Sequence, residues 1–340
     1  MYAACGESIA AILLRVGLMN LRGRSGVRPM AIVLVAAAVT IAAPYAQSRY
    51  PARVVMLTTH SSPGGGSDVF LREMAPHLSR IMGIKVVVRN LAGGSGARAM
   101  AALARANPDG SRFYATTPTF VYTSLMSSPS ARYTDLEPVV NIFFDPEVLY
   151  TAANSQFETL QQVIDHARGG QGRWGAANPA SLERQAMEQL KQRARVTPVI
   201  ATFEGGGDML INVLNHTLDM GIGELQEIRA QLDAGRVRVL AVVGDERLSQ
   251  LPEVRTVREL GIDLSVRKFR GLAGPKGMPR EVIAAWEAAI PKLLADPEYR
   301  RIYTRNNLLP GFIPHGEYVK FIDEFGRQTA AYLRETGVIR

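Results

Sequence analysis

Two glycine-rich segments in the first third of the chain have the composition of anion-binding loops. The first reads Pro63-Gly64-Gly65-Gly66-Ser67-Asp68, and the second reads Leu91-Ala92-Gly93-Gly94-Ser95-Gly96. Each lies between a predicted strand and a predicted helix. A helix N-terminus presents unpaired backbone N–H groups and about half a unit of positive charge, and glycine lets that backbone approach a ligand closely. Each loop is therefore a candidate binding site for a carboxylate.

A third loop of the same kind occurs further along the chain, at Glu204-Gly205-Gly206-Gly207-Asp208. One glycine cluster alone is best interpreted as a tight turn, but three of them at strand ends favour a ligand crevice. Thr117 lies in a hydroxyl-rich segment at the end of another predicted strand, and His60 precedes the first loop. Both are candidates to approach the ligand. Ser67 either caps the following helix or donates to the ligand, and the sequence favours neither role.

The sequence lacks the patterns of several catalytic sites. No serine lies in a G-x-S-x-G elbow, no loop has the G-x-x-x-x-G-K-[ST] pattern of a nucleotide site, and the second loop departs from G-x-G-x-x-G at its last position. The five histidines show neither H-x-x-x-H nor H-x-H spacing. We therefore predict no catalytic residue, no metal and no cofactor. A serine hydrolase that uses Ser67 with His60 is the enzyme alternative, with neither an acid partner nor an oxyanion arrangement evident.

Strand-like and helix-like segments alternate around these loops. Segment 53–59 is a strand candidate, segment 69–82 has apolar residues at helical spacing, and another strand, helix and strand follow. This βαβαβ order predicts a mostly parallel sheet with helices on both faces. The pattern returns between residues 159 and 243 with its own glycine-rich turn, and segments 281–295 and 315–333 are predicted to be helical. The fold class is therefore α/β, with two similar lobes and a crevice between them.

Composition and charge restrict the class of protein. The 340 residues suffice for two domains, and 47% hydrophobic with 21% charged residues is typical of a soluble globular protein. The formal net charge is +8, but the basic residues are scattered and have no interleaved aromatics. That distribution excludes the electrostatic pattern of a nucleic-acid-binding protein, and we predict no nucleic-acid partner.

The first 46 residues have the layout of an export signal. A basic segment, 21–29, precedes an uninterrupted apolar run, 30–43, and small residues lead to a predicted cleavage after Ala46. The apolar run is shorter than the roughly 20 residues that span a membrane, so we predict a cleaved signal peptide and no anchor. Met19 is an alternative start, because residues 1–18 do not resemble an export signal.

Removal of this segment would change the mature protein in two ways. The segment carries four arginines and one glutamate, so the formal charge would fall from +8 to +5. It also contains Cys5, the only cysteine, so the mature protein would have no disulfide and no thiolate metal site. No cysteine lies near the cleavage point, which argues against a lipid anchor. We expect a free periplasmic protein.

A set of short motifs occurs in a fixed order from residue 49 to the C-terminus. They are Tyr50-Pro51, 63–68, Asn90 with 93–96, Pro108-Asp109-Gly110, 133–139, 203–206, 234–242 and 271–279. In this order they resemble the substrate-binding proteins of tripartite tricarboxylate transporters, often called Bug proteins. The ordered set is specific, although no single motif is.

The resemblance implies a two-lobe, type II-like periplasmic binding protein. Such a protein closes on a small organic carboxylate and delivers it to the integral-membrane permease subunits of a tripartite transporter, and a monomer is expected. The implied boundaries are 47–147 with 269–340 for lobe 1 and 148–268 for lobe 2. Delivery to a membrane sensor is an alternative that the sequence does not separate from transport.

The resemblance also implies how the ligand is held. In such proteins backbone N–H groups, ordered water and hydroxyl side chains of the crevice loops bind the carboxylate. Carried over position by position, the contacts come from Gly64, Gly65, Gly66, Ser67, Gly93, Gly94, Ser95, Gly96, Ala97, Thr117 and Ser181.

Three departures from the family pattern affect the predicted ligand. His60-Ser61 stands where many members have Pro-Phe, and segment 178–184 replaces a loop that is usually richer in glycine and serine. Gly223-Glu224 stands where an Asp-Asn pair is common at the crevice. Glu224 pairs with Arg229 or Arg184, or it receives a cationic group of the ligand, and we rank the structural pairing first.

Overall fold

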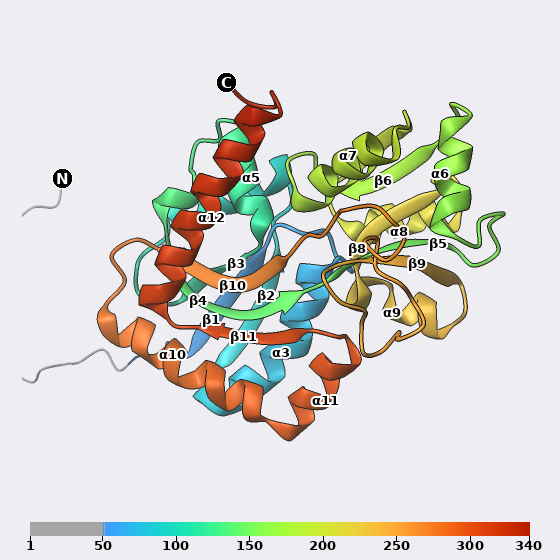
Figure 1. The fold of residues 1–340 in the computed structure, drawn as a ribbon. Helices are drawn as coiled ribbons and strands as arrows, with labels where there is room; N and C mark the ends of the chain where they lie inside the picture. Colours follow the sequence, from blue (N-terminus) through green and yellow to red (C-terminus); the bar gives the residue numbers. More distant parts are fainter. Residues whose placement is uncertain (1–49, 51) are drawn as a thin grey trace, which may run out of the picture. The chain divides into compact units, whose positions relative to one another are not determined.

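The computed structural model describes Tyr50 and residues 52–340. The predicted signal peptide, its cleavage site and Cys5 lie outside the described residues. In the described part, the strands form two sheets, and helices pack on each of them (Figure 1). We call each sheet with its helices a lobe, lobe 1 and lobe 2. Among the described helices, none has both the length and the apolar character that a membrane span requires.

Lobe 1 combines the start of the described chain with its end. Its strands are β1 (Val54–Thr59), β2 (Lys85–Asn90), β3 (Arg112–Thr116), β4 (Leu136–Asp145), β10 (Lys268–Pro275) and β11 (Leu309–Ile313). Its helices are α3 (Gly66–Met82), η1 (Gly94–Gly96), α4 (Ala97–Ala104), α5 (Pro118–Met126), η2 (Tyr133–Asp135), α10 (Arg280–Ala295), α11 (Pro297–Arg305) and α12 (His315–Glu335). The sheet order is β11-β4-β10-β3-β1-β2. One hydrophobic core contains α3, α10 and α11, and another contains α4, α5 and α12.

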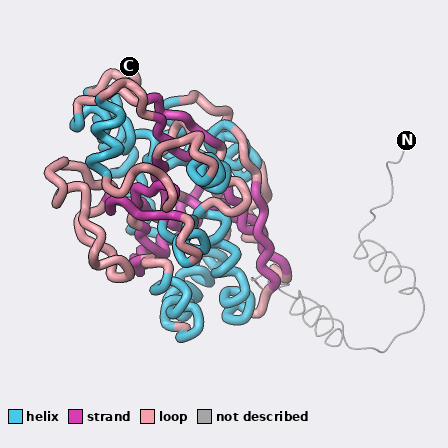
Figure 2. The backbone as a smooth tube through the Cα atoms, turned by 90° about the vertical axis from the view of Figure 1, so that its right-hand side faces the viewer, coloured by secondary structure: helices cyan, strands magenta, loops and turns pink. Residues whose placement is uncertain are grey.

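Lobe 2 is formed by the middle of the chain. Its strands are β5 (Glu147–Ala152), β6 (Arg173–Ala177), β7 (Val199–Phe203), β8 (Met220–Glu224) and β9 (Val237–Val243). Its helices are α6 (Leu160–Arg168), α7 (Leu182–Ala194), α8 (Gly206–Leu214) and α9 (Leu225–Asp233). The sheet order is β7-β6-β8-β5-β9. Helices α6 and α7 contribute to one core and α8 and α9 to the other. Figure 2 shows the strands lying among helices and loops in a view turned by 90° from Figure 1.

Both sheets are mixed, which refines the predicted parallel arrangement. The pairs β1-β2, β1-β3, β6-β7 and β6-β8 are parallel. Every antiparallel pair contains β4, β5 or β10. These strands adjoin the two places where the chain passes between the sheets, at Pro146 and between Val243 and Lys268. The parallel pairs belong to the predicted βαβ units. The antiparallel pairs are formed by β4, β5 and β10, the strands next to the two passages between the sheets.

Helix α3 shows how local sequence positions the crevice. Phe70, Met74 and Leu78 repeat at a spacing of one helical turn, and all three are buried against the sheet of lobe 1. Gly83 ends the helix in the left-handed conformation with φ 66°, which is the usual glycine C-terminal signal. The packed stripe fixes the helix axis, so its N-terminus at Gly66 points into the space between the lobes.

Candidate functional site

The predicted loops of lobe 1 lie at one edge of its sheet. Strands β1, β2 and β3 are mutually parallel neighbours, so their carboxyl ends meet at the same edge. The loops that follow them lead into α3, α4 and α5. Loops after β6, β7 and β8 of lobe 2 lead into α7, α8 and α9. Hydrogen bonds and close contacts described below join the two sets, so the crevice is closed in this structure.

The first and third glycine loops meet across the crevice. A Cβ added at Gly205 would lie 2.8 Å from the amide nitrogen of Ser62, and one at Gly207 would lie 2.7 Å from the carbonyl oxygen of Pro63. Real Cβ atoms do not approach backbone this closely. Gly205 has an extended backbone with φ −179°, so the close approach of the lobes, and not backbone strain, requires glycine there.

The backbone N–H groups of the first loop are already engaged by groups of the protein. Gly64 donates to Oδ2 of Asp68 at 2.9 Å, Gly65 donates to the carbonyl oxygen of Ser62 at 3.1 Å, and Gly66 donates to Oε1 of Glu227 at 3.2 Å. Glu227 belongs to the first turn of α9 in lobe 2. The first loop therefore binds two carboxylates of the protein itself, those of Asp68 and Glu227.

Lys268, on the strand that returns to lobe 1, lies among three buried carboxylates. Its Nζ atom forms ion pairs with Glu147 at 3.2 Å and with Glu183 and Glu224. All four side chains are 5% exposed or less. An ammonium has three N–H donors, so one lysine can address all three carboxylates. Those three acids could otherwise hold a metal ion, but the ammonium occupies that position.

Arg270 forms a second buried centre on the same strand. It donates to Oδ2 of Asp145 at 2.5 Å, to Oε1 of Glu224 at 2.7 Å and to Oγ of Ser67 at 3.0 Å. The side chain of Ser67 therefore does not cap α3. Its hydroxyl oxygen accepts a hydrogen bond from the guanidinium group of Arg270. Arg270 links the first loop to Glu224 of lobe 2, so these contacts hold the two lobes together.

Glu224 lies in the crevice, but its partners differ from those expected. It pairs with Lys268 and Arg270, whereas Arg184 pairs with Glu188 and Arg229 with Asp233. Burial by itself raises the pKa of Glu224, but the two neighbouring cations lower the pKa to about 2. The expected pairing was wrong because β10, which brings both cations to Glu224, was not predicted from the sequence.

Three other acids of the crevice, Asp145, Glu147 and Glu227, have pKa values raised above the ordinary value. Burial raises the pKa of Asp145 to about 6, against the opposing effect of Arg270. Burial also raises the pKa of Glu147 and of Glu227 well above the ordinary value, and Glu224 adds to both shifts. Two cations thus hold Glu224 ionised, while burial and the charge of Glu224 raise the pKa of Asp145, Glu147 and Glu227.

The second glycine loop makes a further contact between the lobes. Gly93, Gly94, Ser95 and Gly96 all have positive φ, so this turn depends on glycine at three of four positions. Ser95 accepts a hydrogen bond from Oγ1 of Thr123 on its carbonyl oxygen at 2.6 Å. Its hydroxyl oxygen accepts from the amide of Ala180 in lobe 2 at 3.3 Å.

Three buried polar atoms at the strand ends have no hydrogen-bond partner among the described residues. They are Oγ1 of Thr117, Oγ of Ser62 and Oδ1 of Asn178. Thr117 directly precedes α5 but its side chain does not cap that helix. Buried polar groups almost always have partners. Unsatisfied atoms on both lobes are therefore the expected signature of a place that a ligand or ordered water fills.

Comparison with known sequences decides the family. Residues 70–338 match the sequence model described as "Tripartite tricarboxylate transporter family receptor". The chain belongs to this family. A protein from the tcbD-tcbE intergenic region of Pseudomonas sp. strain P51 is 30% identical over 256 residues, covering 73% of this chain and 76% of that protein. Protein BugT of Bordetella pertussis is 26% identical over 304 residues, covering 87% and 93% respectively. The resemblance drawn from the motifs is confirmed.

Solved structures show the same fold. The periplasmic binding protein BugD aligns with a TM-score of 0.80 at 22% identity, over 85% of this receptor and 99% of BugD. An R. palustris protein, Rpa4515 with adipate, aligns with a TM-score of 0.81 at 22% identity, over 86% and 99%. At this identity the comparison concerns the fold alone. The predicted two-lobe α/β architecture is confirmed.

Ser181 and His60 are engaged in local structure of this receptor. Ser181 caps α7: its hydroxyl accepts from the amide of Arg184 at 3.0 Å and donates to the carbonyl oxygen of Ala177 at 2.5 Å. Nδ1 of His60 bonds the hydroxyl of Tyr114 at 2.7 Å. Burial, assisted by the cations of the crevice, lowers the pKa of His60 to about 3. His60 is thus neutral, and neither Ser67 nor His60 has the other as its hydrogen-bond partner, as a hydrolase would need.

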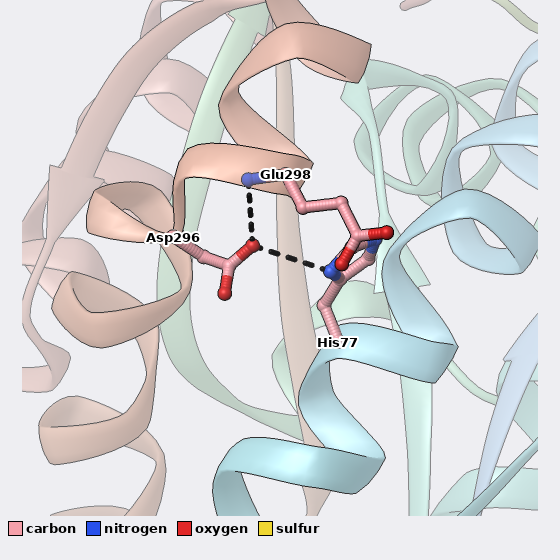
Figure 3. A group of neighbouring side chains, drawn as sticks. All are labelled: His77, Asp296 and Glu298. Carbon is pink, nitrogen blue, oxygen red and sulfur yellow. Dashed lines mark hydrogen bonds and ion pairs between the residues drawn. The ribbon is translucent and has the colours of Figure 1, made fainter.

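Another group with metal-ligand chemistry lies away from the crevice, between α3 and α11 (Figure 3). Oδ1 of Asp296 lies 3.4 Å from Nδ1 of His77 and accepts from the amides of Glu298 at 3.1 Å and Tyr299 at 2.9 Å. Arg80 donates to the other carboxylate oxygen at 2.5 Å. The carboxylate of Asp296 is therefore the N-terminal cap of α11, and the group is structural.

A groove of about 580 Å³ leads from the surface to the first loop of the receptor. Lobe 1 contributes Gly64 and Glu73 to its lining, and lobe 2 contributes Gly207, Gln226 and Glu227. The groove therefore runs between the lobes. It brings solvent to the carboxylate that occupies the first loop.

Residues that the sequence did not indicate are central to this site. Lys268, Arg270 and Asp145 were not singled out, because a charged residue inside a strand carries no motif. Glu227 follows Glu224 at the spacing of a helix N-terminal acid, a position that normally indicates capping and not a site. Only contacts between distant segments distinguish the two roles.

Proposed function

We propose that this protein captures a small organic carboxylate between its lobes in the periplasm and delivers it to the permease subunits of a tripartite tricarboxylate-type transporter. The observation that carries the proposal is the set of unpartnered buried atoms on both lobes, Thr117 Oγ1 and Ser62 Oγ on one and Asn178 Oδ1 on the other. They lie at the carboxyl ends of strands, where ligands bind in open α/β sheets.

The second loop and the start of α5 supply the chemistry for an anion. Helix α5 begins directly after the unpartnered Thr117 hydroxyl, and the start of a helix favours a nearby anion. The second loop contacts the same helix, because the hydroxyl of Thr123 donates to the carbonyl oxygen of Ser95. We assign the ligand's carboxylate to this part of lobe 1, with contacts from Gly93, Gly94, Ser95, Gly96, Ala97 and Thr117. The first loop, from Gly64 to Ser67, then forms the wall that lobe 2 closes against.

Related proteins support the class of ligand. The structure of Rpa4515 contains adipate, and that of the R. palustris protein MatC contains malate. Both ligands are carboxylates, and both proteins share this fold. Family membership and the export signal predicted from residues 1–46 support delivery to permease subunits and release into the periplasm.

A thermal-shift screen of carboxylates tests capture. The mature protein is unfolded and refolded to remove any carried ligand, then heated with mono-, di- and amino-carboxylates. A ligand at a hundredfold excess over its Kd stabilises the fold by about 2.7 kcal/mol, which raises Tm measurably. A folded, ligand-free protein whose Tm no carboxylate changes contradicts the proposal.

Export and partner are tested separately. The full-length chain expressed in a Gram-negative host is expected in the periplasmic fraction, shortened by the signal peptide, as shown by N-terminal sequencing. Pull-down from membranes that contain the candidate permease is expected to recover it only when ligand is present. Full-length protein in the cytoplasm, or no recovery with ligand, contradicts these parts of the proposal.

A further inference from the structure

The base of the crevice carries an excess of buried negative charge. Its charged side chains, all 8% exposed or less, are Asp145, Glu147, Glu183, Glu224, Glu227, Lys268 and Arg270. Five carboxylates therefore face two cations. Even if Glu147 and Glu227 are protonated, three carboxylates remain against two cations. A dicarboxylate would add two more negative charges to a site of low effective dielectric, where like charges repel strongly.

Several acceptors in this cluster have no donor. Oε1 of Glu147 has only the ion-pair contact of 3.2 Å with Lys268, and Oε2 of Glu147 and Oε2 of Glu183 have no hydrogen-bond partner among the described residues. Both side chains are 4% exposed or less. One oxygen from each of these two acids and one from Glu224 lie within 4.8 Å of one another around the Lys268 ammonium, so the unpartnered oxygens belong to one compact cluster. An unpaired buried acceptor is costly, and a cationic N–H donor is the group that satisfies it best.

Glu227 occupies the first glycine loop, which is one of the two loops that could bind a carboxylate of the ligand. Its Oε1 accepts from the amide of Gly66. Its carboxylate also fills the space left by the missing side chains of Gly206 and Gly223, because a Cβ at either position would overlap it. A ligand can therefore place a carboxylate at the second loop, but a second carboxylate finds the first loop already occupied.

We infer that the crevice takes a ligand with one carboxylate and one cationic group, an amino or guanidino acid, and that it rejects dicarboxylates. This inference rests on the proposed function. The ligand's carboxylate lies at the second loop, and its ammonium or guanidinium group lies toward the acids of the crevice base. Glu227, which lines the groove between the lobes, is the specificity-determining residue, because it blocks an incoming anion and attracts an incoming cation.

Matched ligands test the inference directly. Isothermal titration compares 5-aminopentanoate, 4-guanidinobutanoate, pentanoate and pentanedioate, which are of similar length and differ at one end, with shorter and longer homologues. The α-amino acids are compared with the corresponding α-hydroxy acids. We expect a cationic member of at least one set to bind at least tenfold more tightly than the anionic or neutral member.

The outcomes separate this inference from the proposed function. Dicarboxylates that bind as tightly as the amino acids, or more tightly, overturn the inference and leave carboxylate capture standing. Binding of no member overturns both. Binding of the cationic members alone supports both.

A charge-removing variant assigns the specificity. Glu227→Gln keeps a side-chain oxygen for the Gly66 amide, so the closed fold is retained, which Tm verifies, but the amide cannot ionise beside an incoming cationic group as the carboxyl can. We expect the preference for the cationic ligand over the dicarboxylate to fall at least tenfold. Glu281→Gln on the exposed start of α10 is the matched control, and its preference stays as in the parent. An unchanged preference in both Glu227→Gln and Glu147→Gln contradicts the assignment to these acids.

Discussion

The first and second glycine loops are similar in sequence but serve different ends. In the first, the amides of Gly64, Gly65 and Gly66 each bond to a group of the protein. In the second, the amides of Gly96 and Ala97 bond to carbonyl oxygens of the loop itself, and among the described residues no acid of lobe 2 is bonded to it. The hydroxyl of Thr117, at the start of the neighbouring helix α5, has no partner. Glycine-rich composition thus shows that a loop can hold a carboxylate, but not whose carboxylate it holds.

The difference comes from what lobe 2 presents to each loop. The first loop faces the start of α9, which carries Glu227, and lies beside the ionic cluster around Lys268 and Arg270. The second faces the loop before α7, where the amide of Ala180 is the contact. Lobe 2 places an acid opposite the first loop, so we assign that loop to closure of the lobes. It places a neutral backbone group opposite the second loop, so we assign that loop to ligand binding.

The largest effect is expected from the cation beneath the first loop. Lys268→Met leaves three buried carboxylates without their ammonium, and breaking a buried ion pair in this way costs about 3–5 kcal/mol. Urea unfolding measures the loss. Lys292→Met, at an exposed position of α10, is the control and stays close to the parent. A Lys268→Met protein as stable as the parent would show that the cluster does not support the first loop.

Closure over the first loop is tested at the glycine that faces it. Gly205→Ala places a Cβ against the Ser62 backbone of the other lobe, while its extended φ tolerates any residue. We expect ligand affinity to fall at least tenfold, or about 1.4 kcal/mol, with a more open protein by small-angle scattering. Gly316→Ala, where a Cβ meets nothing within 4 Å, is the control. Equal affinity and shape in the two variants would refute the requirement for close approach.

Protonation of the acids below the first loop gives a pH-dependent effect. Burial raises the pKa of Glu147 above the ordinary value of 4.5, so the folded protein keeps a proton that the unfolded chain loses. The free energy of unfolding therefore falls as pH rises above about 4.5. Glu147→Gln removes this loss, and we expect the variant to gain about 1–3 kcal/mol on the parent between pH 5 and pH 8.

Urea unfolding at the two pH values measures this gain, with Glu281→Gln as control. Glu224 does not interfere, because its pKa of about 2 confines its own loss of stability to acid below about pH 4.5. A gain that is the same at pH 5 and pH 8 would mean that Glu147 ionises normally in the folded protein.

The smallest effects compare one hydroxyl from each loop region. Thr117→Val removes an unpartnered hydroxyl, so ligand affinity is expected to fall by about 1 kcal/mol while stability holds or rises slightly. Ser67→Ala removes an acceptor of Arg270 and is expected to lower stability by about 1–2 kcal/mol. Titration and unfolding of both variants measure these changes. If Thr117→Val instead lowered stability and Ser67→Ala lowered ligand affinity, the roles assigned to the two loop regions would be wrong.

Local patterns predicted much of the fold. Helix α7 and strands β7 and β9 lie in the segment 159–243, where the alternating pattern of strands and helices was predicted. Helix α5 and strands β4 and β10 were not assigned. Strand β10 contains Lys268 and Arg270, whose charges interrupt an apolar run, and only their buried partners make them acceptable in a core strand.

The site was predictable to the extent that it depends on backbone. Glycine loops at strand ends and Thr117 follow from local order, and the structure places them at the crevice. Arg270 and Glu227 could not be found in that way, because each has a partner more than 100 positions away in the chain, such as Asp145, 125 positions from Arg270, and Gly66, 161 positions from Glu227.

By itself the sequence determined the alternation of elements, the family and the position of loops able to bind an anion, since these depend on neighbours along the chain. The tertiary structure alone decided that Glu227 occupies the first loop and that five acids meet two cations at the crevice base. Burial makes each charge sensitive to every other within a few ångströms. Those neighbours come from both lobes and are set only when the lobes close.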